Sequence, residues 1–276
     1  MPGAMHARQR DSRRRRRLRF RVVVSIGVLG LLLAAACGPP SHHRDDDWGE
    51  KSALEPEITG DNDKDEARWR HELDSDPWGD DSDLLTDDPP IVAVNANAGN
   101  PHYEPHASRP VPIREGDLVL LDVWGKKNTP GAVYYDITWM GFVGGTPSHR
   151  IAEVFTIVRY ARDAGGKTVL DAINSGRRIA GWEVDRSTRG HIQKAGYGDY
   201  FIHRTGHSIG TDVHSNGANM DDLEIHDERQ ILPNSCFSIE PGIYLPEFGV
   251  RSEVNVLVRA KSAEVTGKIQ REIVTI

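Results

Sequence analysis

Four acidic side chains interrupt segments that otherwise have the pattern of apolar β-strands. They are Asp122 in VLLDV, Asp136 in YYDITW, Glu240 in FSIEP and Glu253 in VRSEVNV. Burying an ionised carboxylate costs several kcal/mol unless the group is paired or bound to a metal ion. Because side chains alternate along a strand, Arg251 shares the face of Glu253. One arginine cannot balance four carboxylates, whereas two divalent cations can, so the pattern predicts a metal site.

The apolar periodicity of residues 91–276 predicts an α+β domain. Strands are expected in IVAVNANAG, in 116–125 and in AVYYDITWMGFVG, with the turn KKNTPG between the last two. Helices are expected over 150–175 and 183–195, with a kink or break at the adjacent glycines 165 and 166. An antiparallel meander is expected in the remaining segments, YFIHRTGHSIG, SCFSIEPGIYL, GVRSEVNVLV and AEVTGKIQREIVTI. This order differs from the strand–helix alternation of an α/β protein.

The predicted strands can bring the acids together. A hairpin register can set Asp122 and Asp136 side by side on one face, and Glu240 and Glu253 repeat this arrangement. The segment HRTGHSIG adds two histidines four residues apart in the chain. Taken alone, it does not distinguish metal ligands from a base and its orienting partner, or from packing residues in a glycine-rich strand.

A basic head precedes an apolar run at the start of the chain. The first 21 residues contain nine arginines and one acid, and the largely apolar residues 22–36 end at Cys37. This order is typical of an export signal, and the run is shorter than the roughly 20 residues of a membrane-spanning helix. LAAAC resembles a bacterial lipoprotein box, which implies a signal over 1–37, lipidation of Cys37 and anchoring of an exported protein to the cell envelope. An uncleaved single-span anchor is one alternative; a misassigned start codon, which implies a cytoplasmic protein, is another.

Residues 38–90 have the composition of a disordered, solvated linker. The stretch is acidic, contains glycine and proline, and lacks apolar periodicity. Without residues 1–36 the formal net charge falls from −7 to −15, because nine arginines and one aspartate are removed. Nucleic acid is not an expected partner of so acidic a chain, because it is bound through basic patches. With Cys37 lipidated, only Cys236 remains, so no intramolecular disulfide is expected.

Five motifs in residues 91–276 resemble the pita-bread metallopeptidases, which include methionine aminopeptidase, prolidase and Xaa-Pro aminopeptidase. In the family's order they are LLDVW, YYDITW, HRTGHSIG, SIEPGIY and VRSEVNV. The resemblance implies a pita-bread fold, in which helices cover a curved antiparallel sheet. It also implies a fold shortened at its N-terminus, because the family's first helices are not recognisable before residue 91.

The resemblance implies a site for two metal ions. Asp122 would bind one ion, His207 and Glu240 would bind the other, and Asp136 and Glu253 would bridge both. Such ligands suit Mn²⁺, with Co²⁺, Fe²⁺ and Zn²⁺ as alternatives. A hydroxide shared by the ions would attack the peptide carbonyl while Glu240 transfers its proton.

The resemblance also assigns residues that face the substrate. His203 and His214 would be catalytic, and His214 would stabilise the oxyanion of the scissile carbonyl. His102 and Arg251 would bind substrate, with His106 competing for the place of His102. The glycines of TGHSIG would admit close approach of backbone. Three aromatic residues are expected in the core: Trp124, Tyr135 and Trp139.

The leading functional hypothesis is hydrolysis of peptide bonds near the N-terminus of a substrate, above all Xaa-Pro bonds. A prolidase-type dipeptidase and a non-proline aminopeptidase are the alternatives within the family. A hypothesis of another class is an inactive, truncated pita-bread domain that serves as a binding lipoprotein. The expected partners are a peptide and, through the lipid anchor, a membrane; a homodimer is compatible with this reading.

Overall fold

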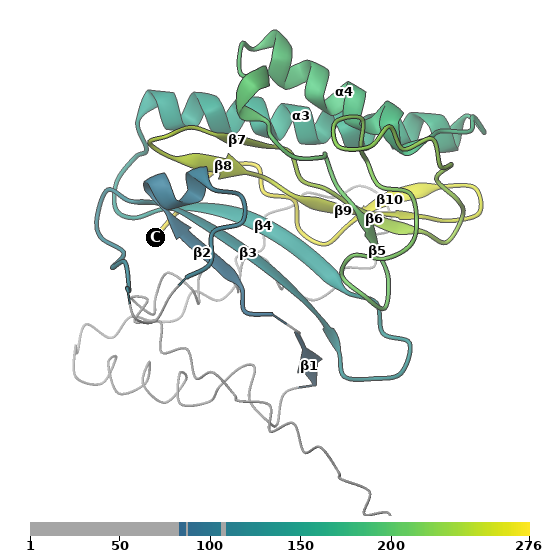
Figure 1. The fold of residues 1–276 in the computed structure, drawn as a ribbon, viewed down its shortest axis with the longest axis horizontal. Helices are drawn as coiled ribbons and strands as arrows, with labels where there is room; N and C mark the ends of the chain where they lie inside the picture. The colour runs from purple at the N-terminus through teal and green to yellow at the C-terminus, as the bar shows by residue number, and fades with distance from the viewer. Residues whose placement is uncertain (1–82, 87, 106–108) are drawn as a thin grey trace, which may run out of the picture.

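The computed structural model describes residues 83–86, 88–105 and 109–276. The expected signal, Cys37 and most of the expected linker lie outside the described residues, as does His106. Within those three ranges, no helix combines the length and the apolar character needed to cross a bilayer. The α+β class is confirmed, with largely antiparallel strands beside a pair of helices (Figure 1).

The first sheet is built on a long hairpin. Strands β3 (Leu118–Lys127) and β4 (Tyr135–Phe142) are antiparallel, and β2 (Ile91–Val94) pairs with β3. The hairpin closes through Pro130 and Gly131, where the N–H of Ala132 donates to the Thr129 carbonyl over 3.2 Å. Proline presets φ at the first central position, and Gly131 supplies the positive φ of 77° at the second. This is the pattern of a type II turn.

Both edges of this sheet differ from the sequence-based expectation. The short strand β1 (Leu84–Leu85) pairs with the outer end of β3, although it lies in the range assigned to a linker. At the other edge β11 (Val274–Thr275) is parallel to β4, not antiparallel. The N–H of Ile276 donates to the Phe142 carbonyl and extends this pairing, so the last residues of the chain cover the edge of β4.

Two helices lie along one side of the strands (Figure 1). Helix α3 (His149–Asn174) begins at Ser148, whose hydroxyl accepts from a backbone N–H of the first turn, and runs through both glycines without a break. The expected break is wrong because Gly165 lies where α3 meets α4 (Gly181–Lys194) and the second sheet. A Cβ on Gly165 would lie 2.3 Å from the Thr188 hydroxyl oxygen. Two short 3₁₀ helices complete the helical elements: η1 (Asn95–Gly99) follows β2, and η2 (Gly198–Tyr200) follows α4.

The second sheet follows the helices in the chain and is antiparallel, with strand order β10-β9-β6-β5. Within HRTGHSIG only Ser208–Ile209 is strand, so the expected long strand is wrong there. A hairpin of β7 and β8 lies between β6 and β9 in the sequence. The bounds of these strands are β5 (Ser208–Ile209), β6 (Cys236–Ile239), β7 (Gly242–Tyr244), β8 (Gly249–Arg251), β9 (Val254–Val258) and β10 (Ala263–Thr266).

The two sheets meet beside the acidic residues. Asn255 in β9 donates from Nδ2 to the Asp136 carbonyl in β4 over 2.6 Å, and Thr138 in β4 donates to Glu253 Oε2 over 2.9 Å. The face of the first sheet that carries Asp122 also carries Leu118 and Leu120, which pack against α3. The apolar core therefore holds the faces that carry the acids in fixed positions.

Candidate metal centre

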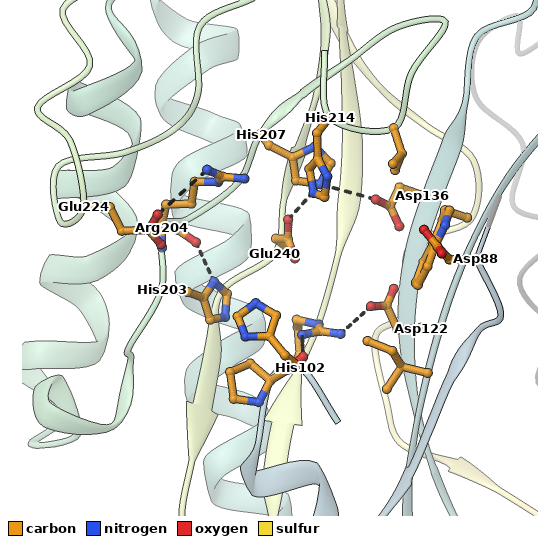
Figure 2. Close-up of a pocket in the computed structure, with 15 residues that line it drawn as sticks. Asp88, His102, Asp122, Asp136, His203, Arg204, His207, His214, Glu224 and Glu240 are labelled. Atoms are coloured by element: carbon orange, nitrogen blue, oxygen red, sulfur yellow. Dashed lines mark hydrogen bonds and ion pairs between the residues drawn. The ribbon is translucent and has the colours of Figure 1, made fainter. Parts of the chain in front are cut away.

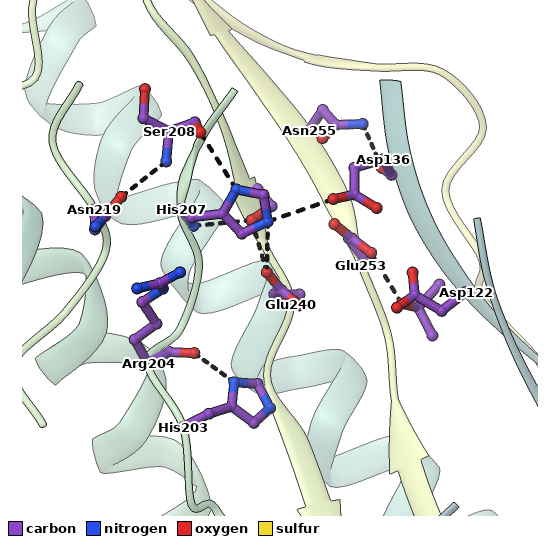
Figure 3. A network of polar contacts seen from close by, with 12 residues as sticks. Asp122, Asp136, His203, Arg204, His207, Ser208, Asn219, Glu240, Glu253 and Asn255 are labelled. Carbon is purple, nitrogen blue, oxygen red and sulfur yellow. Dashed lines mark hydrogen bonds and ion pairs between the residues drawn. The ribbon is translucent and has the colours of Figure 1, made fainter. Parts of the chain in front are cut away.

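A pocket of about 340 Å³ gathers most of the site residues predicted from the sequence (Figure 2). They come from the first sheet, from the β7–β8 hairpin and from loops next to the strands of the second sheet. The predicted residues in its wall are His102, Asp122, Asp136, His203, His207, His214, Glu240 and Arg251. The remaining predicted ligand, Glu253, lies beside Asp122 and Asp136 in the same network of polar contacts (Figure 3).

The hairpin register places Asp122 and Asp136 on one face of the first sheet. Asp122 is opposite Thr138, and Asp136 is opposite Trp124, so the carboxylates are diagonal neighbours. Trp124 consequently lines the pocket and is only half-buried, which differs from its expected place in the core. The other two aromatic residues pack in the cluster on the opposite face: Tyr135 and Trp139.

Glu240 and Glu253 extend the ladder of the second sheet. Glu240 directly follows β6 and Glu253 directly precedes β9, and the last paired residues are Ile239 and Val254. The two glutamates thus occupy the next positions outward, at the end of the sheet that faces β4. This placement brings carboxylates from two sheets to one point.

The donor atoms of this cluster have spacings that suit divalent cations. Ligand atoms of Asp122, Asp136 and Glu253 lie within 4.8 Å of one another. His207 Nε2 lies 3.3 Å from Asp136 Oδ2 and 3.3 Å from Glu240 Oε1 (Figure 3). With metal–ligand bonds of roughly 2.0–2.2 Å, two atoms that bind one ion are about 3–3.5 Å apart.

Two oxygens in the cluster lack a hydrogen-bond partner within the part of the chain that the structure describes. Asp122 Oδ1 and Glu253 Oε1 are buried and accept no hydrogen bond from the residues that the structure describes. A buried oxygen without a partner is costly, and a cation would satisfy both oxygens. The buried acidic cluster therefore fits a metal site.

Burial governs the protonation of the carboxylates in the metal-free protein. It raises the pKa of Asp122 to about 7, and it also raises the pKa of Asp136. Burial raises the pKa of Glu253 well above its ordinary value. At Glu240 burial also raises the pKa, but the charges of His207, Arg251 and His203 and the hydrogen bond from Ser238 together outweigh it, so the pKa lies below its ordinary value. Glu240 is therefore the carboxylate most readily ionised at neutral pH.

Arg251 connects the cluster to the pocket wall. Its Nη2 donates to Asp122 Oδ2 over 2.5 Å and its Nε donates to Thr138 Oγ1 over 3.0 Å. Its Nη1 donates to the Tyr244 hydroxyl and the Pro101 carbonyl, each over 3.3 Å. Burial lowers the pKa of Arg251, but the neighbouring acidic groups, Asp122 foremost, together raise it well above its ordinary value. The guanidinium is a permanent cation held in one orientation.

His203 lines the pocket, and both of its ring nitrogens have protein partners. Nδ1 contacts the Arg204 carbonyl and Nε2 contacts the Tyr244 hydroxyl, each over 2.7 Å. Burial lowers the pKa of His203 to about 4, so at pH 7 the ring is neutral and carries one hydrogen. A carbonyl can only accept, so Nδ1 carries that hydrogen and the Tyr244 hydroxyl donates to Nε2. Burial raises the pKa of Tyr244 to about 12, which keeps the hydroxyl protonated.

Strand β6 holds the backbone of His207 in place through Ser238. The N–H of His207 donates to Ser238 Oγ over 3.0 Å, and the Ser238 hydroxyl donates to Glu240 Oε1 over 2.9 Å. Gly206 permits this approach, because a Cβ would lie 2.0 Å from the Ser238 carbonyl oxygen. The structure thus has the close approach of backbone that is expected at the glycines of TGHSIG.

His214 and Arg204 occupy the same side of the pocket (Figure 2). The ring centroid of His214 lies 4.2 Å from that of His207, and the two planes are inclined by 64°. Burial lowers the pKa of His214, and the charges of His207 and Arg204 lower it further. The Nη1 of Arg204 lies 3.9 Å from Glu224 Oε2, which is a long distance for an ion pair.

Several side chains that hold the site were not predicted from the sequence, among them Thr138, Tyr244 and Asp185. Thr138 had a readable signal, since it follows Asp136 by two residues and shares its face. Tyr244 bonds to His203 only because the chain reverses after β6, and no periodicity indicates this. Asp185 in α4 accepts from the Thr205 N–H over 2.9 Å, a tertiary contact that no local pattern shows.

Comparison with known proteins identifies relatives. The family model of metallopeptidase family M24 matches residues 55–260. The Xaa-Pro dipeptidase of Lactobacillus helveticus is 38% identical over 164 residues, which cover 59% of this chain and 40% of that protein. A solved prolidase from Thermococcus sibiricus matches with a TM-score of 0.59 and 33% identity, covering 76% of this chain and 52% of that one. For an X-Pro aminopeptidase from Thermotoga maritima the TM-score is 0.57, the identity 28%, and the coverage 68% and 49%. The chain spans about half the length of these relatives.

Proposed function

Because the chain belongs to metallopeptidase family M24 and has the pita-bread fold that its motifs predict, we propose that it is a metal-dependent peptidase. Its proposed reaction is hydrolysis of peptide bonds near the N-terminus of a substrate, with Xaa-Pro bonds preferred. One observation carries the proposal: buried carboxylates from two sheets converge with His207 in the wall of one pocket.

The proposed metal ligands are the residues of that convergence. Asp122, Asp136, His207, Glu240 and Glu253 would hold two divalent ions, with Mn²⁺ favoured and Co²⁺, Fe²⁺ and Zn²⁺ as alternatives. When bound, such ions supply Lewis-acid polarisation of the scissile carbonyl and lower the pKa of water. The unsatisfied oxygens of Asp122 and Glu253 support this assignment.

The side chains around the cluster have distinct proposed roles. Glu240 lines the pocket and is readily ionised, so it can accept a proton and return it to the leaving amine. His214 is a neutral imidazole on a loop at the pocket, placed to donate to the developing oxyanion. Arg251 holds Asp122 in place, and His102 contributes to the wall that contacts the substrate. His203 positions the Tyr244 hydroxyl, because both of its ring nitrogens are occupied.

The preference for proline rests on the chemistry of the bond and on the relatives. A proline after the scissile bond has no amide N–H, so the site must position the carbonyl and the ring by other groups. The pocket supplies imidazoles and aromatic surface for this purpose, from His102, His214 and Trp124. The relatives reported above act, by their names, on Xaa-Pro bonds.

The decisive experiment measures metal content and turnover together. The full chain is purified, its metals are counted by elemental analysis, and kcat/KM is measured with Ala-Pro-type and Met-Ala-type peptides. We expect bound divalent ions, loss of turnover on chelation, recovery with Mn²⁺ or Co²⁺, and faster cleavage of Ala-Pro-type peptides. Full turnover in excess chelator, with no metal detected, would refute the metal site. Equal or faster cleavage of Met-Ala-type peptides would refute the proline preference alone.

A dipeptidase is the second candidate, and Arg204 favours it. The guanidinium of Arg204 lines the pocket next to His214, and its 3.9 Å distance to Glu224 leaves it available to the free carboxylate of a dipeptide. When an aminopeptidase binds a long peptide, the C-terminal carboxylate of that substrate lies far from the scissile bond and outside the pocket. Comparison of Ala-Pro with Ala-Pro-Ala-Ala as substrates separates the two candidates.

A further inference from the structure

The hairpin of β3 and β4 continues beyond Asp122 and Asp136 and contacts the loop that carries His214. Lys126 follows Asp122 by four positions and Trp124 by two, so its side chain leaves β3 on the face of the site. The type II turn at Pro130 and Gly131 stiffens the tip. Strand β1 supports the same segment, with Leu85 paired to Lys126.

The hairpin contacts the loop 210–217, which carries His214. The N–H of Tyr134 donates to the Gly210 carbonyl over 2.9 Å. Lys126 Nζ donates to the Thr211 carbonyl over 2.5 Å and lies 4.7 Å from the centroid of the Tyr134 ring. Tyr134 is buried, so the ring gives the ammonium a fixed surface to lie on.

The inner side of the loop is held by β5. The N–H of Ser215 donates to the Ser208 carbonyl over 2.8 Å, and the N–H of Gly217 donates to Ser208 Oγ over 3.1 Å. Between these anchors and the hairpin, Thr211 and His214 are exposed and add nothing to the core. Apolar packing is therefore confined to the half-buried Val213, and the conformation of this stretch depends mainly on a few hydrogen bonds.

We propose that Lys126 is a positioning residue: its bond to the Thr211 carbonyl, supported by Tyr134, fixes the loop so that His214 stays beside His207 and faces the pocket. The inference rests on the proposed catalytic role of His214. A bond from a charged donor is stronger than a neutral one, and it adds to the bond from the Tyr134 N–H on the side of the loop that β5 does not contact. Small displacements of a catalytic group lower the reaction rate. The bond between Lys126 and Thr211 therefore affects turnover, although Lys126 does not contact the substrate.

The test compares three variants that differ in one property each. Lys126→Met removes the donor, and Lys126→Arg retains a cationic donor. Lys127→Met is the matched control, because Lys127 is exposed and leaves the same hairpin on the opposite face. Amide hydrogen exchange of residues 211–216 is measured on the metal-free protein, and kcat and KM are measured on the metal-loaded protein. Thermal unfolding verifies that all variants are folded.

We expect Lys126→Met to accelerate exchange in this loop roughly tenfold, the change that follows loss of one hydrogen bond from a charged group. Its kcat should fall about tenfold with KM little changed, and Lys126→Arg should restore most of both. Combined with His214→Ala, Lys126→Met should reduce kcat no further, because both changes remove the same contribution.

Three outcomes would overturn the inference. They are equal exchange in Lys126→Met and Lys127→Met, equal kcat in these two variants while His214→Ala is impaired, and a full additional loss in the double variant. Absence of turnover in every protein, wild type included, would instead refute the proposed function. In that case hydrogen exchange alone decides whether Lys126 holds the loop.

Discussion

Glu253 is the carboxylate whose surroundings depend most on a bound cation. It is 1% exposed, one oxygen accepts from Thr138, and the other has no hydrogen-bond partner among the described residues. Burial raises its pKa well above the ordinary value and so favours its neutral form in the metal-free protein. A neutral side chain of the same shape should therefore fit the metal-free fold.

Glu253→Gln tests this difference between folding and function. The amide cannot bridge two cations, so at least one ion should be lost and kcat should fall by more than about 100-fold, the upper range for removal of a group that only supports a ligand. The metal-free variant should be as stable as metal-free wild type, because the buried side chain at position 253 is uncharged in both proteins. Elemental analysis, kinetics and urea unfolding measure the three quantities. Glu247→Gln, at an exposed glutamate, is the control, and unchanged metal content in Glu253→Gln would show that Glu253 is not a ligand.

At the scale of elements, two adjacent glycines of α3 have opposite roles. A Cβ on Gly165 would lie 2.3 Å from Thr188 Oγ1 in α4, whereas a Cβ on Gly166 would meet no atom within 4 Å. Gly165→Ala should lower the free energy of unfolding by about 1–3 kcal/mol, since overpacking exceeds the gain in helix propensity. Gly166→Ala should raise it by up to about 1 kcal/mol, because alanine favours a helix and nothing is displaced. Urea unfolding of both variants measures the difference; destabilisation by both would contradict the packing argument.

The same glycines show what the sequence could and could not predict. The sequence located α3 and the strands that carry Asp122 and Asp136, because apolar periodicity is a local property. The single strand predicted for GVRSEVNVLV was wrong, because the chain leaves β8 at Arg251 and enters β9 at Val254, with Glu253 between them. The predicted break in α3 was wrong, since the space available to a side chain is a tertiary property. The long strand predicted for HRTGHSIG was wrong for a related reason. Buried side chains such as Asp185 hold that backbone in a loop. The parallel pairing of β11 was equally unreadable from local sequence.

For the site, residue types and spacing could be read from the sequence, and the structure added the contacts between these residues. Eight predicted residues line the pocket, and Glu253 lies beside two of them. The support by Thr138 and Tyr244 depends on contacts between residues far apart in the chain, which one sequence does not reveal. The ligand roles remain predictions that metal analysis tests.

At the scale of the whole molecule, the proposed metal ions join two sheets. Asp122 and Asp136 belong to the first sheet, and Glu240 and Glu253 extend the second. A ligand that binds only the folded state raises stability in proportion to the logarithm of its concentration relative to Kd. Divalent ions should therefore raise the midpoint of thermal unfolding.

The size of that increase should depend on pH. Burial raises the pKa of Asp122 to about 7, so below pH 7 the metal must displace a proton from this group, and the raised pKa of Glu253 acts in the same direction. Metal affinity should thus increase as pH rises towards 7 and above. We expect Mn²⁺ to raise the midpoint more at pH 8 than at pH 6, measured by thermal unfolding at equal free Mn²⁺. An equal increase at both pH values would contradict the assignment of protonated ligands.

The pairing of Arg251 with Asp122 also has a consequence for the newly synthesised chain. Glu253 follows Asp122 by 131 positions, and Arg251 precedes Glu253 by two. At translation rates of about 5–20 residues per second, Glu253 is synthesised roughly 7–26 s after Asp122. The cation that neutralises Asp122 emerges from the ribosome immediately before Glu253. The cluster therefore never gains its last carboxylate before the arginine that offsets the charge of its first.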